Sequence, residues 1–395
     1  MFITELPQNA EKFCREAGRS LSERDRDLLR RAVGTFYHNL IPFPISDLPA
    51  LSVLRAIAPS PETYPGVWNW DSAFHAIALA RWDAPLAREQ LTFFFETQQE
   101  DGMFPDCINR DEGIVTAQTK PPILFWAYEE LDRRAPVPEE RKAVYEKLCA
   151  NERFWCEKRS RGGLFFYSGC IDDPGGYAAK YESGWDTSPR FDGNITDRLW
   201  AIDLGCYMVL AYRALEYLAE RIGNAEDVRR WKEKEAALTE NINQKLYHEA
   251  LGCYCDTFME NGQATGILTP ASFLPLYIGI ASQEQAEAMA RLAASPEKFH
   301  PLFPVVSYDD PAYTENDYWR GPTWINCAAT AVIGLKRYGF DALADGFRER
   351  LLSMLDREKR GLYEYYNSRT GVGLGAADYG WTASFLLILL LDWGK

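Results

Sequence analysis

Two carboxylic acids stand beside aromatic residues in stretches that break regular structure. Asp186 follows Trp185 in ESGWDTSPRF (182–191), and Glu364 precedes Tyr365 in GLYEYYNSRTGVGLG (361–375). Aromatic neighbours reduce solvation, which raises the pKa of a carboxyl group and suits a general acid. Glycoside hydrolysis needs one carboxyl group to protonate the leaving oxygen and a second to activate water or attack the anomeric carbon. We therefore interpret Asp186 and Glu364 as a catalytic pair, although most of the 57 Asp and Glu residues must be solvated surface groups.

Aromatic and polar residues occur together elsewhere in the chain. Aromatic residues make up 14% of the sequence, including 12 Trp and 21 Tyr. Many stand beside Gly, Asn and Asp in five stretches: 64–75, 104–122, 182–191, 314–326 and 361–375. Indole and phenol faces stack on the C–H patches of sugars, while Asp, Glu, Asn, Gln and Arg pair with hydroxyl groups. This mixture predicts a carbohydrate site.

Helices must position these stretches. Apolar residues recur at helical spacing in many segments, and a Ser-x-x-Asp cap opens the first of them. The clearest expected helices cover 22–40, 70–82, 85–99, 121–131, 138–155, 196–223 and 225–247. Five more are expected between residue 272 and the C-terminal segment, whereas strand signals are few and short.

The pairing of these helices predicts an all-α fold. About a dozen helices arrive in pairs, one member amphipathic and charged, the other apolar on most faces. Six such pairs closing on themselves would form an (α/α)6 barrel, with 1–395 as a single catalytic domain. The segments 62–71, 101–120, 158–195, 301–323 and 358–380 would then meet at a funnel-shaped mouth. A helical solenoid is the alternative, but the sequence has no repeat period that favours it.

Composition excludes several classes of function. A net charge of −14 and a pI near 5.0 argue against binding to nucleic acid or anionic membranes. Nine scattered cysteines form neither a disulfide framework nor a zinc motif, so we expect reduced thiols and no metal or cofactor. The N-terminus lacks a signal peptide and no apolar run could span a bilayer, which predicts a cytoplasmic protein. The oligomeric state cannot be read from the sequence.

Three motifs resemble one enzyme family. ESGWDTSPRF, YWRGPTWIN (318–326) and GLYEYYNSRTGVGLG followed by YGWTAS are similar to motifs of glycoside hydrolase family 63, whose clan includes the trehalases. The small bacterial members that act on mannosylglycerate and glucosylglycerate are the nearest in appearance. The resemblance implies an (α/α)6 barrel and hydrolysis with inversion, with Asp186 as general acid and Glu364 as general base. The chain is too short for the β-sandwich of larger members, which disfavours branched glycans as substrates.

Further positions are implied by the resemblance. The candidate substrate-binding residues are Tyr64, Trp68, Asn69, Trp70, Asp71, Gln118, Trp185, Arg190, Tyr318, Trp319, Arg320, Gly321, Trp324 and Tyr365. Trp70 and Trp324 have an equal interpretation as inner-helix core residues. Arg190 and Arg320 could instead pair with Glu182 or Asp192 and never meet substrate. A charged aglycone such as glycerate would need a cation, which either arginine could provide.

Two other functions remain open at this stage. A sugar epimerase or isomerase could use the same barrel, but it would need histidines as acid and base. Only His38, His75, His248 and His300 are present, and only His75 falls in a candidate segment. A catalytically silent carbohydrate-binding protein is the second alternative, and it would need neither an acid nor a base. The predicted reaction is hydrolysis of a small α-glucoside or α-mannoside.

Overall fold

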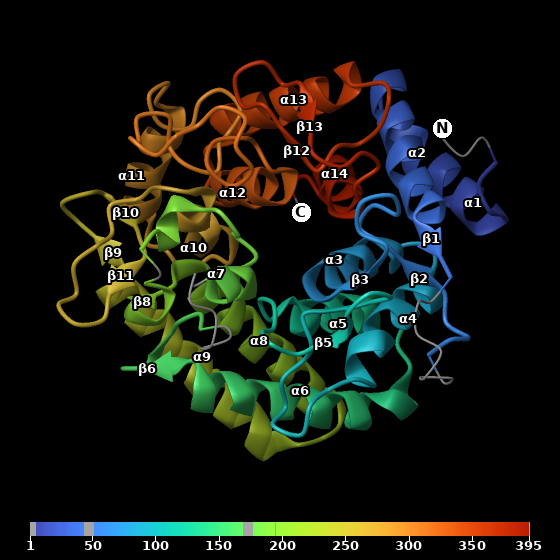
Figure 1. The fold of residues 1–395 in the computed structure, drawn as a ribbon, viewed down its shortest axis with the longest axis horizontal. Coiled ribbons are helices and arrows are strands. Elements are labelled where there is room, and N and C mark those ends of the chain that lie inside the picture. The colour runs from blue at the N-terminus through green and yellow to red at the C-terminus, as the bar shows by residue number, and fades with distance from the viewer. Residues whose placement is uncertain (1–4, 43–50, 169–176, 194, 395) are drawn as a thin grey trace.

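The computed structural model describes residues 5–42, 51–168, 177–193 and 195–394, which form a ring of helices (Figure 1). The helices are α1 (Gln8–Ala17), α2 (Glu23–His38), α3 (Asn69–Leu79), α4 (Ala84–Phe95), α5 (Ile123–Arg134), α6 (Pro138–Lys158), α7 (Tyr177–Ser183), α8 (Ile202–Arg221), α9 (Ala225–Lys245), α10 (Leu274–Tyr277), α11 (Gln283–Ala294), α12 (Ile325–Arg337), α13 (Asp341–Arg357) and α14 (Gly380–Leu391).

Six of these helices make a closed inner ring. In order they are α3, α5, α8, α10, α12 and α14, and α14 packs against α3 to complete the circle. Helices α2, α4, α6, α9, α11 and α13 alternate with them along the chain and lie outside the ring (Figure 1). This is the (α/α)6 barrel that the sequence predicts. The solenoid alternative is wrong, because the ring closes.

Burial follows the expected division between inner and outer helices. Every residue of α3 is buried, and α14 is buried from Gly380 to Leu390. The outer helix α9 buries only Trp231, Leu238 and Ile242 over its 21 residues. An inner helix packs on all sides and is therefore mostly apolar, whereas an outer helix exposes one face to water.

Short antiparallel strands lie in the connections. Their bounds are β1 (Leu40–Ile41), β2 (Ala56–Ile57), β3 (Gly66–Trp68), β4 (Cys107–Asn109), β5 (Gly113–Val115), β6 (Ser160–Arg161), β7 (Leu164–Phe165), β8 (Leu199–Trp200), β9 (Tyr247–His248), β10 (Cys253–Tyr254), β11 (Thr257–Phe258), β12 (Tyr365–Tyr366) and β13 (Gly373–Leu374). The strands pair as β1–β2, β3–β4–β5, β6–β7, β8–β11, β9–β10 and β12–β13. These strand pairs lie in the connections that lead from outer helices into inner helices, at the end of the barrel where the inner helices begin.

The structure corrects the expected helix over 196–223. Residues 196–198 form a 3-10 turn, β8 follows, and α8 begins only at Ile202. The tertiary partner decides this break, because β8 pairs with β11 and aligns Trp200 with Thr257. Helix α1 and the short α7 were not expected from the sequence. The predicted cap of α2 is confirmed, since the Ser22 hydroxyl accepts a hydrogen bond from the Asp25 amide at 3.1 Å.

The cysteines of the described residues do not form disulfides. The eight cysteines within the described ranges are free thiols, and Cys170 lies outside those ranges. Cys253 and Cys255 place their sulfur atoms 3.5 Å apart in the core, and no group of side chains in the described residues could hold a metal ion. Across these same ranges, no helix has the length and apolar character needed to cross a membrane.

Candidate active site

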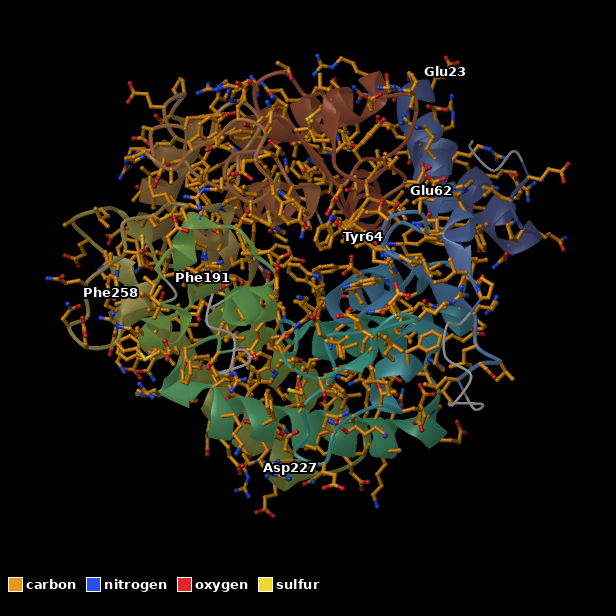
Figure 2. The ribbon with its side chains drawn as sticks, viewed as in Figure 1. Glu23, Glu62, Tyr64, Phe191, Asp227 and Phe258 are labelled. Carbon is orange, nitrogen blue, oxygen red and sulfur yellow. The ribbon has the colours of Figure 1, made fainter. Side chains whose placement is uncertain are left out.

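A cavity opens where the inner helices begin. The sequence placed its candidate residues in five stretches, and four of them precede or include the start of an inner helix: α3, α5, α12 or α14. The cavity is lined by Pro59, Tyr64, Trp68, Trp70, Asp71, Lys120, Gly184, Asp186, Tyr318, Trp319, Tyr379 and Trp381. Figure 2 places Tyr64 near the middle of the ring, while Asp227 and Phe258 lie at its rim. Residues that are distant in sequence therefore meet at one mouth of the barrel.

The backbone before Asp186 is shaped by a close approach to Trp70. Gly184 has a φ angle of 74°, and a Cβ atom at this position would lie 2.3 Å from the Trp70 ring. Only glycine fits both requirements. Trp185 is 2% exposed and its ring lies 4.8 Å from that of Trp319, so the indole is fixed on the wall behind Asp186.

Asp186 reaches the cavity without a hydrogen bond to its Oδ1 atom. That oxygen is buried and has no hydrogen-bond partner among the described residues. Burial raises the pKa of Asp186 to about 6, with Lys120 opposing the shift and Asp106 adding to it. A carboxyl group that is desolvated and unpaired in this way favours its protonated form. It suits a proton donor.

Glu364 is buried in a different environment. Its Oε1 atom accepts hydrogen bonds from the hydroxyl groups of Tyr64, at 3.1 Å, and Tyr318, at 3.3 Å. Its Oε2 atom accepts a third bond from the Ala376 amide at 3.0 Å. Burial raises the pKa of Glu364, but these three donors lower it. Hydrogen bonds to a carboxylate stabilise its charged form, so Glu364 is better suited than Asp186 to act as a base.

Asp71 and Asp186 are the carboxyl groups that line the cavity, whereas Glu364 is hydrogen-bonded to two lining residues, Tyr64 and Tyr318. Asp71 stands in the first turn of α3, is 2% exposed, and its Oδ1 atom has no hydrogen-bond partner within the described chain. Burial raises the pKa of Asp71 well above its usual value, and Lys120 acts against this shift. An unpaired oxygen that lines a cavity is available to a hydroxyl group of a ligand.

Stacked aromatic rings form one wall. The rings of Trp319 and Trp324 lie 3.8 Å apart at 11°, and Tyr365 stacks on the far side of Trp324 at 4.9 Å. Trp319 and Trp381 line the cavity, and their indole nitrogens have no hydrogen-bond partner in the part of the chain that is described. These N–H groups are available as donors to a bound sugar.

The two tryptophans left open by the sequence have different positions. Trp70 lines the cavity. Trp324 is fully buried behind Trp319, and its indole nitrogen donates to the Tyr318 carbonyl oxygen at 2.9 Å. The core interpretation thus fits Trp324. Gly321 has a steric role, because a Cβ atom there would lie 2.2 Å from the Thr314 carbonyl oxygen.

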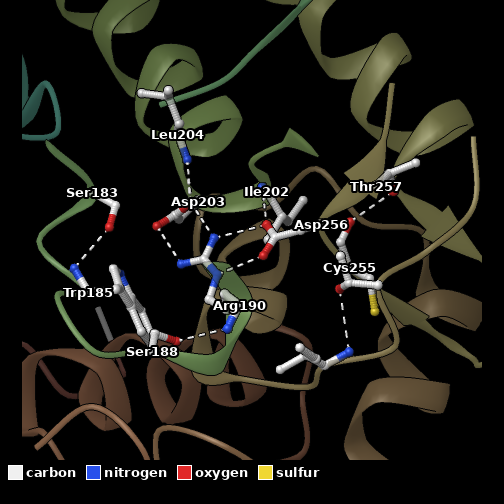
Figure 3. A network of polar contacts seen from close by, with 12 residues as sticks. Ser183, Trp185, Ser188, Arg190, Ile202, Asp203, Leu204, Cys255, Asp256 and Thr257 are labelled. Carbon is white, nitrogen blue, oxygen red and sulfur yellow. Dashed lines mark hydrogen bonds and ion pairs between the residues drawn. The ribbon is translucent and has the colours of Figure 1, made fainter. Parts of the chain in front are cut away.

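Arg190 lies in a buried ion-pair cluster. Its guanidinium group donates four hydrogen bonds of 2.7–2.9 Å, two to Asp203 and two to Asp256 (Figure 3). Arg190 is 0% exposed, and its guanidinium carbon lies 4.8 Å from the ring of Trp185. Its expected contact with substrate is therefore corrected to a structural ion pair. The partners differ from the expected ones, since Glu182 pairs with Arg159 instead.

Arg320 forms the other expected structural pair. It contacts both carboxylate oxygens of Asp192, at 3.1 and 2.8 Å, and donates to the Thr187 carbonyl oxygen at 2.9 Å. The Thr187 hydroxyl accepts a bond from the Trp319 amide at 3.2 Å. These contacts join YWRG to the segment that carries Asp186.

The structure adds a buried charge pair that the sequence analysis missed. Lys120 lines the cavity and forms an ion pair with Asp106 at 3.2 Å. Gln118 and Asn69, both expected to contact sugar, do not line the cavity. The Gln118 amide donates to the other Asp106 oxygen, while Asn69 donates from its side chain to the Pro105 carbonyl at 2.9 Å. Lys120 immediately precedes Pro-Pro and the start of α5, and this position at the start of an inner helix could have marked it as a candidate site residue.

None of the four histidines, all of which are described, lines the cavity. His75 is 0% exposed, and burial lowers its pKa to about 3. His38 lies 3.6 Å from Asp378, and His248 contacts the Thr257 hydroxyl at 2.8 Å. An epimerase that relies on histidine as acid and base does not fit this arrangement.

Comparisons with known proteins agree with the geometry. The model of the mannosylglycerate hydrolase MGH1-like glycoside hydrolase domain matches residues 64–382. The mannosylglycerate hydrolase of Rubrobacter radiotolerans is 26% identical over 415 residues, covering 85% of this chain and 92% of that protein. The structure of the glycoside hydrolase family 63 mannosylglycerate hydrolase from Thermus thermophilus in complex with glucose has a TM-score of 0.76 and 25% identity, covering 92% of this chain and 100% of that chain.

A more distant structure extends the similarity in fold. The neutral trehalase of Saccharomyces cerevisiae has a TM-score of 0.70 at 17% identity, covering 85% of this chain and 72% of that chain. The predicted relation to glycoside hydrolase family 63 is confirmed by the family match and the relatives. The chain is a glycoside hydrolase and belongs to the mannosylglycerate hydrolase MGH1-like glycoside hydrolase family.

Proposed function

We propose that this enzyme hydrolyses a small α-mannoside or α-glucoside with inversion, using Asp186 as general acid and Glu364 as general base. The observation that carries the assignment is the contrast between the two carboxyl groups. Asp186 Oδ1 has no hydrogen-bond partner in the described chain, while Glu364 accepts three hydrogen bonds. Environments that separate two carboxyl groups in this way define the acid and the base.

The reaction follows from these two roles. Asp186 gives its proton to the glycosidic oxygen as the bond from that oxygen to the anomeric carbon breaks. Glu364 takes a proton from a water molecule, whose oxygen attacks the anomeric carbon from the opposite face. The sugar leaves with inverted configuration and the aglycone leaves as an alcohol. Tyr64 and Tyr318 hold Glu364 in place for this step.

The relatives favour a sugar joined to a small acid. Proteins named mannosylglycerate hydrolase match most of this chain, so α-mannosylglycerate and α-glucosylglycerate are the first substrates to test. Trehalose and other small α-glucosides are the second group, because a trehalase shares the fold. The carboxyl groups, indole donors and aromatic faces of the cavity suit one pyranose ring.

A substrate panel with two pairs of variants tests the proposal. Proton NMR of the first-formed anomer should show β-mannose or β-glucose released from the α-glycoside. Asp186→Asn and Glu364→Gln should each lower kcat by about 10²- to 10⁴-fold while the fold is retained. Asp111→Asn and Glu249→Gln change exposed acids and serve as matched controls. Full activity in either catalytic variant, or release of the α-anomer, would overturn the assignment.

A further inference from the structure

The general-acid segment is tied to a buried lysine. Lys120 is 7% exposed and lines the same cavity as Asp186. Its ammonium group pairs with Asp106 at 3.2 Å and donates to the carbonyl oxygen of Tyr181, in the helix α7 that leads into Gly184 and Asp186. One side chain thus joins the 101–120 connection to the segment that presents the acid.

The lysine is itself held by Asp106, and Asp106 is fixed from two other directions. The side-chain amide of Gln118 donates to Asp106 Oδ2, and the backbone N–H of Asn69 donates to the Asp106 carbonyl oxygen at 2.9 Å. Asp106 is 5% exposed. Such a network orders the lysine before any substrate arrives, because several contacts from three chain segments determine its position.

We propose that Lys120, held by Asp106, is a positioning residue for Asp186: it fixes the segment that carries this carboxyl group and keeps a positive charge beside it. The inference rests on the proposed role of Asp186 as general acid. Lys120 and Asp106 act on Asp186 with opposite signs, as a cation and an anion in a poorly solvated site. Among the described residues, the other ionisable groups that interact with Asp186 are Tyr318 and Glu364.

Lys120 and Asp106 should displace the pH profile in opposite directions. A general acid must be protonated, so kcat/KM falls as pH rises through the pKa of Asp186. Removing the Lys120 cation raises this pKa and moves the alkaline limb of the profile to higher pH. Removing the Asp106 charge lowers the pKa and moves that limb to lower pH. A lysine with only a structural role would reduce activity without these opposite displacements.

The experiment compares Lys120→Gln, Lys120→Met and Asp106→Asn with the wild type. Glutamine can still donate to the Tyr181 carbonyl but carries no charge, whereas methionine removes both properties. The pH dependence of kcat/KM is measured with α-D-mannosyl-D-glycerate and α-D-glucosyl-D-glycerate. We expect the alkaline limb to move up by about one pH unit in both Lys120 variants and down in Asp106→Asn. Lys298→Gln, which removes an ion pair with Asp309, is the control with an unmoved limb.

A second readout does not depend on activity. In protein labelled with ¹³C at the aspartate carboxyl groups, the resonance lost in Asp186→Asn reports the titration of Asp186. Its midpoint should rise in Lys120→Gln and fall in Asp106→Asn. An unmoved midpoint and limb in Lys120→Gln would overturn the inference, even with Asp186→Asn inactive. Wild-type activity in Asp186→Asn would instead overturn the proposed role of Asp186 as general acid.

Discussion

The Tyr64 hydroxyl donates a hydrogen bond to Glu364, 300 positions away in the sequence, and Tyr318 donates to the same carboxylate oxygen. Three inner-helix connections therefore meet at one atom of the proposed base. The contact explains how a glutamate that is 2% exposed can carry a negative charge, because its solvation is replaced by oriented donors.

Removal of the Tyr64 hydroxyl should weaken the base. In Tyr64→Phe, the pKa of Glu364 rises because a donor that lowers it is lost. A base must be deprotonated, so the acidic limb of the kcat/KM profile should move to higher pH, with about a 10-fold loss of kcat. Tyr128→Phe removes a tyrosine–glutamate bond of the same 3.1 Å length, to Glu140, outside the cavity. This control should keep the wild-type profile, and equal displacement in both variants would contradict the prediction.

The wild-type enzyme should work best on the acidic side of neutrality. Burial raises the pKa of Asp186 to about 6, and activity requires its protonated form. We therefore expect kcat/KM to fall as pH rises above about 6, with a second decline at lower pH as Glu364 becomes protonated. The measurement is kcat/KM from initial rates between roughly pH 4 and pH 9, an interval that brackets both pKa values. A profile that stays flat to pH 9 would be inconsistent with Asp186 as the acid.

The Arg190 cluster should matter chiefly for stability. Arg190→Met leaves Asp203 and Asp256 buried without their cation, which typically costs about 3–5 kcal/mol. Arg320→Met breaks a pair whose aspartate is 50% exposed and should cost about 0–1 kcal/mol. Urea unfolding compares the two variants. Similar losses would show that the cluster is less important than its burial implies.

Glycine at position 375 should contribute to activity as well as to the turn. Gly375 has a φ angle of 69°, and a Cβ atom there would lie 2.6 Å from Glu364 Oε2. Gly262 has a similar φ angle of 71° with nothing within 4 Å. Alanine at either site carries the same backbone penalty of about 1–2 kcal/mol. Only Gly375→Ala should also displace the base and lower kcat/KM, by about 10-fold or more; unchanged kinetics would show that Glu364 adjusts without loss.

The sequence by itself determined the architecture and the identity of the candidate acid and base. Helical periodicity and the contrast between apolar and charged helices were sufficient to predict paired helices in a barrel, because burial on all sides requires an apolar surface. The sequence did not predict where α8 begins, because its start at Ile202 depends on the pairing of β8 with β11. Such a partner lies far away in the chain and leaves no local periodicity.

Tertiary structure decided what each polar residue contacts. Arg190 and Lys120 are both cations in breaker-rich segments, yet Arg190 is enclosed by two aspartates and Lys120 lines the cavity. Residue type and spacing do not distinguish these outcomes. The two aspartates that enclose Arg190 come from other segments, and Asp106 meets Lys120 only because their shared connection folds back on itself. The interaction of a buried charge depends on distance and local solvation, and both are fixed only when the ring of helices closes.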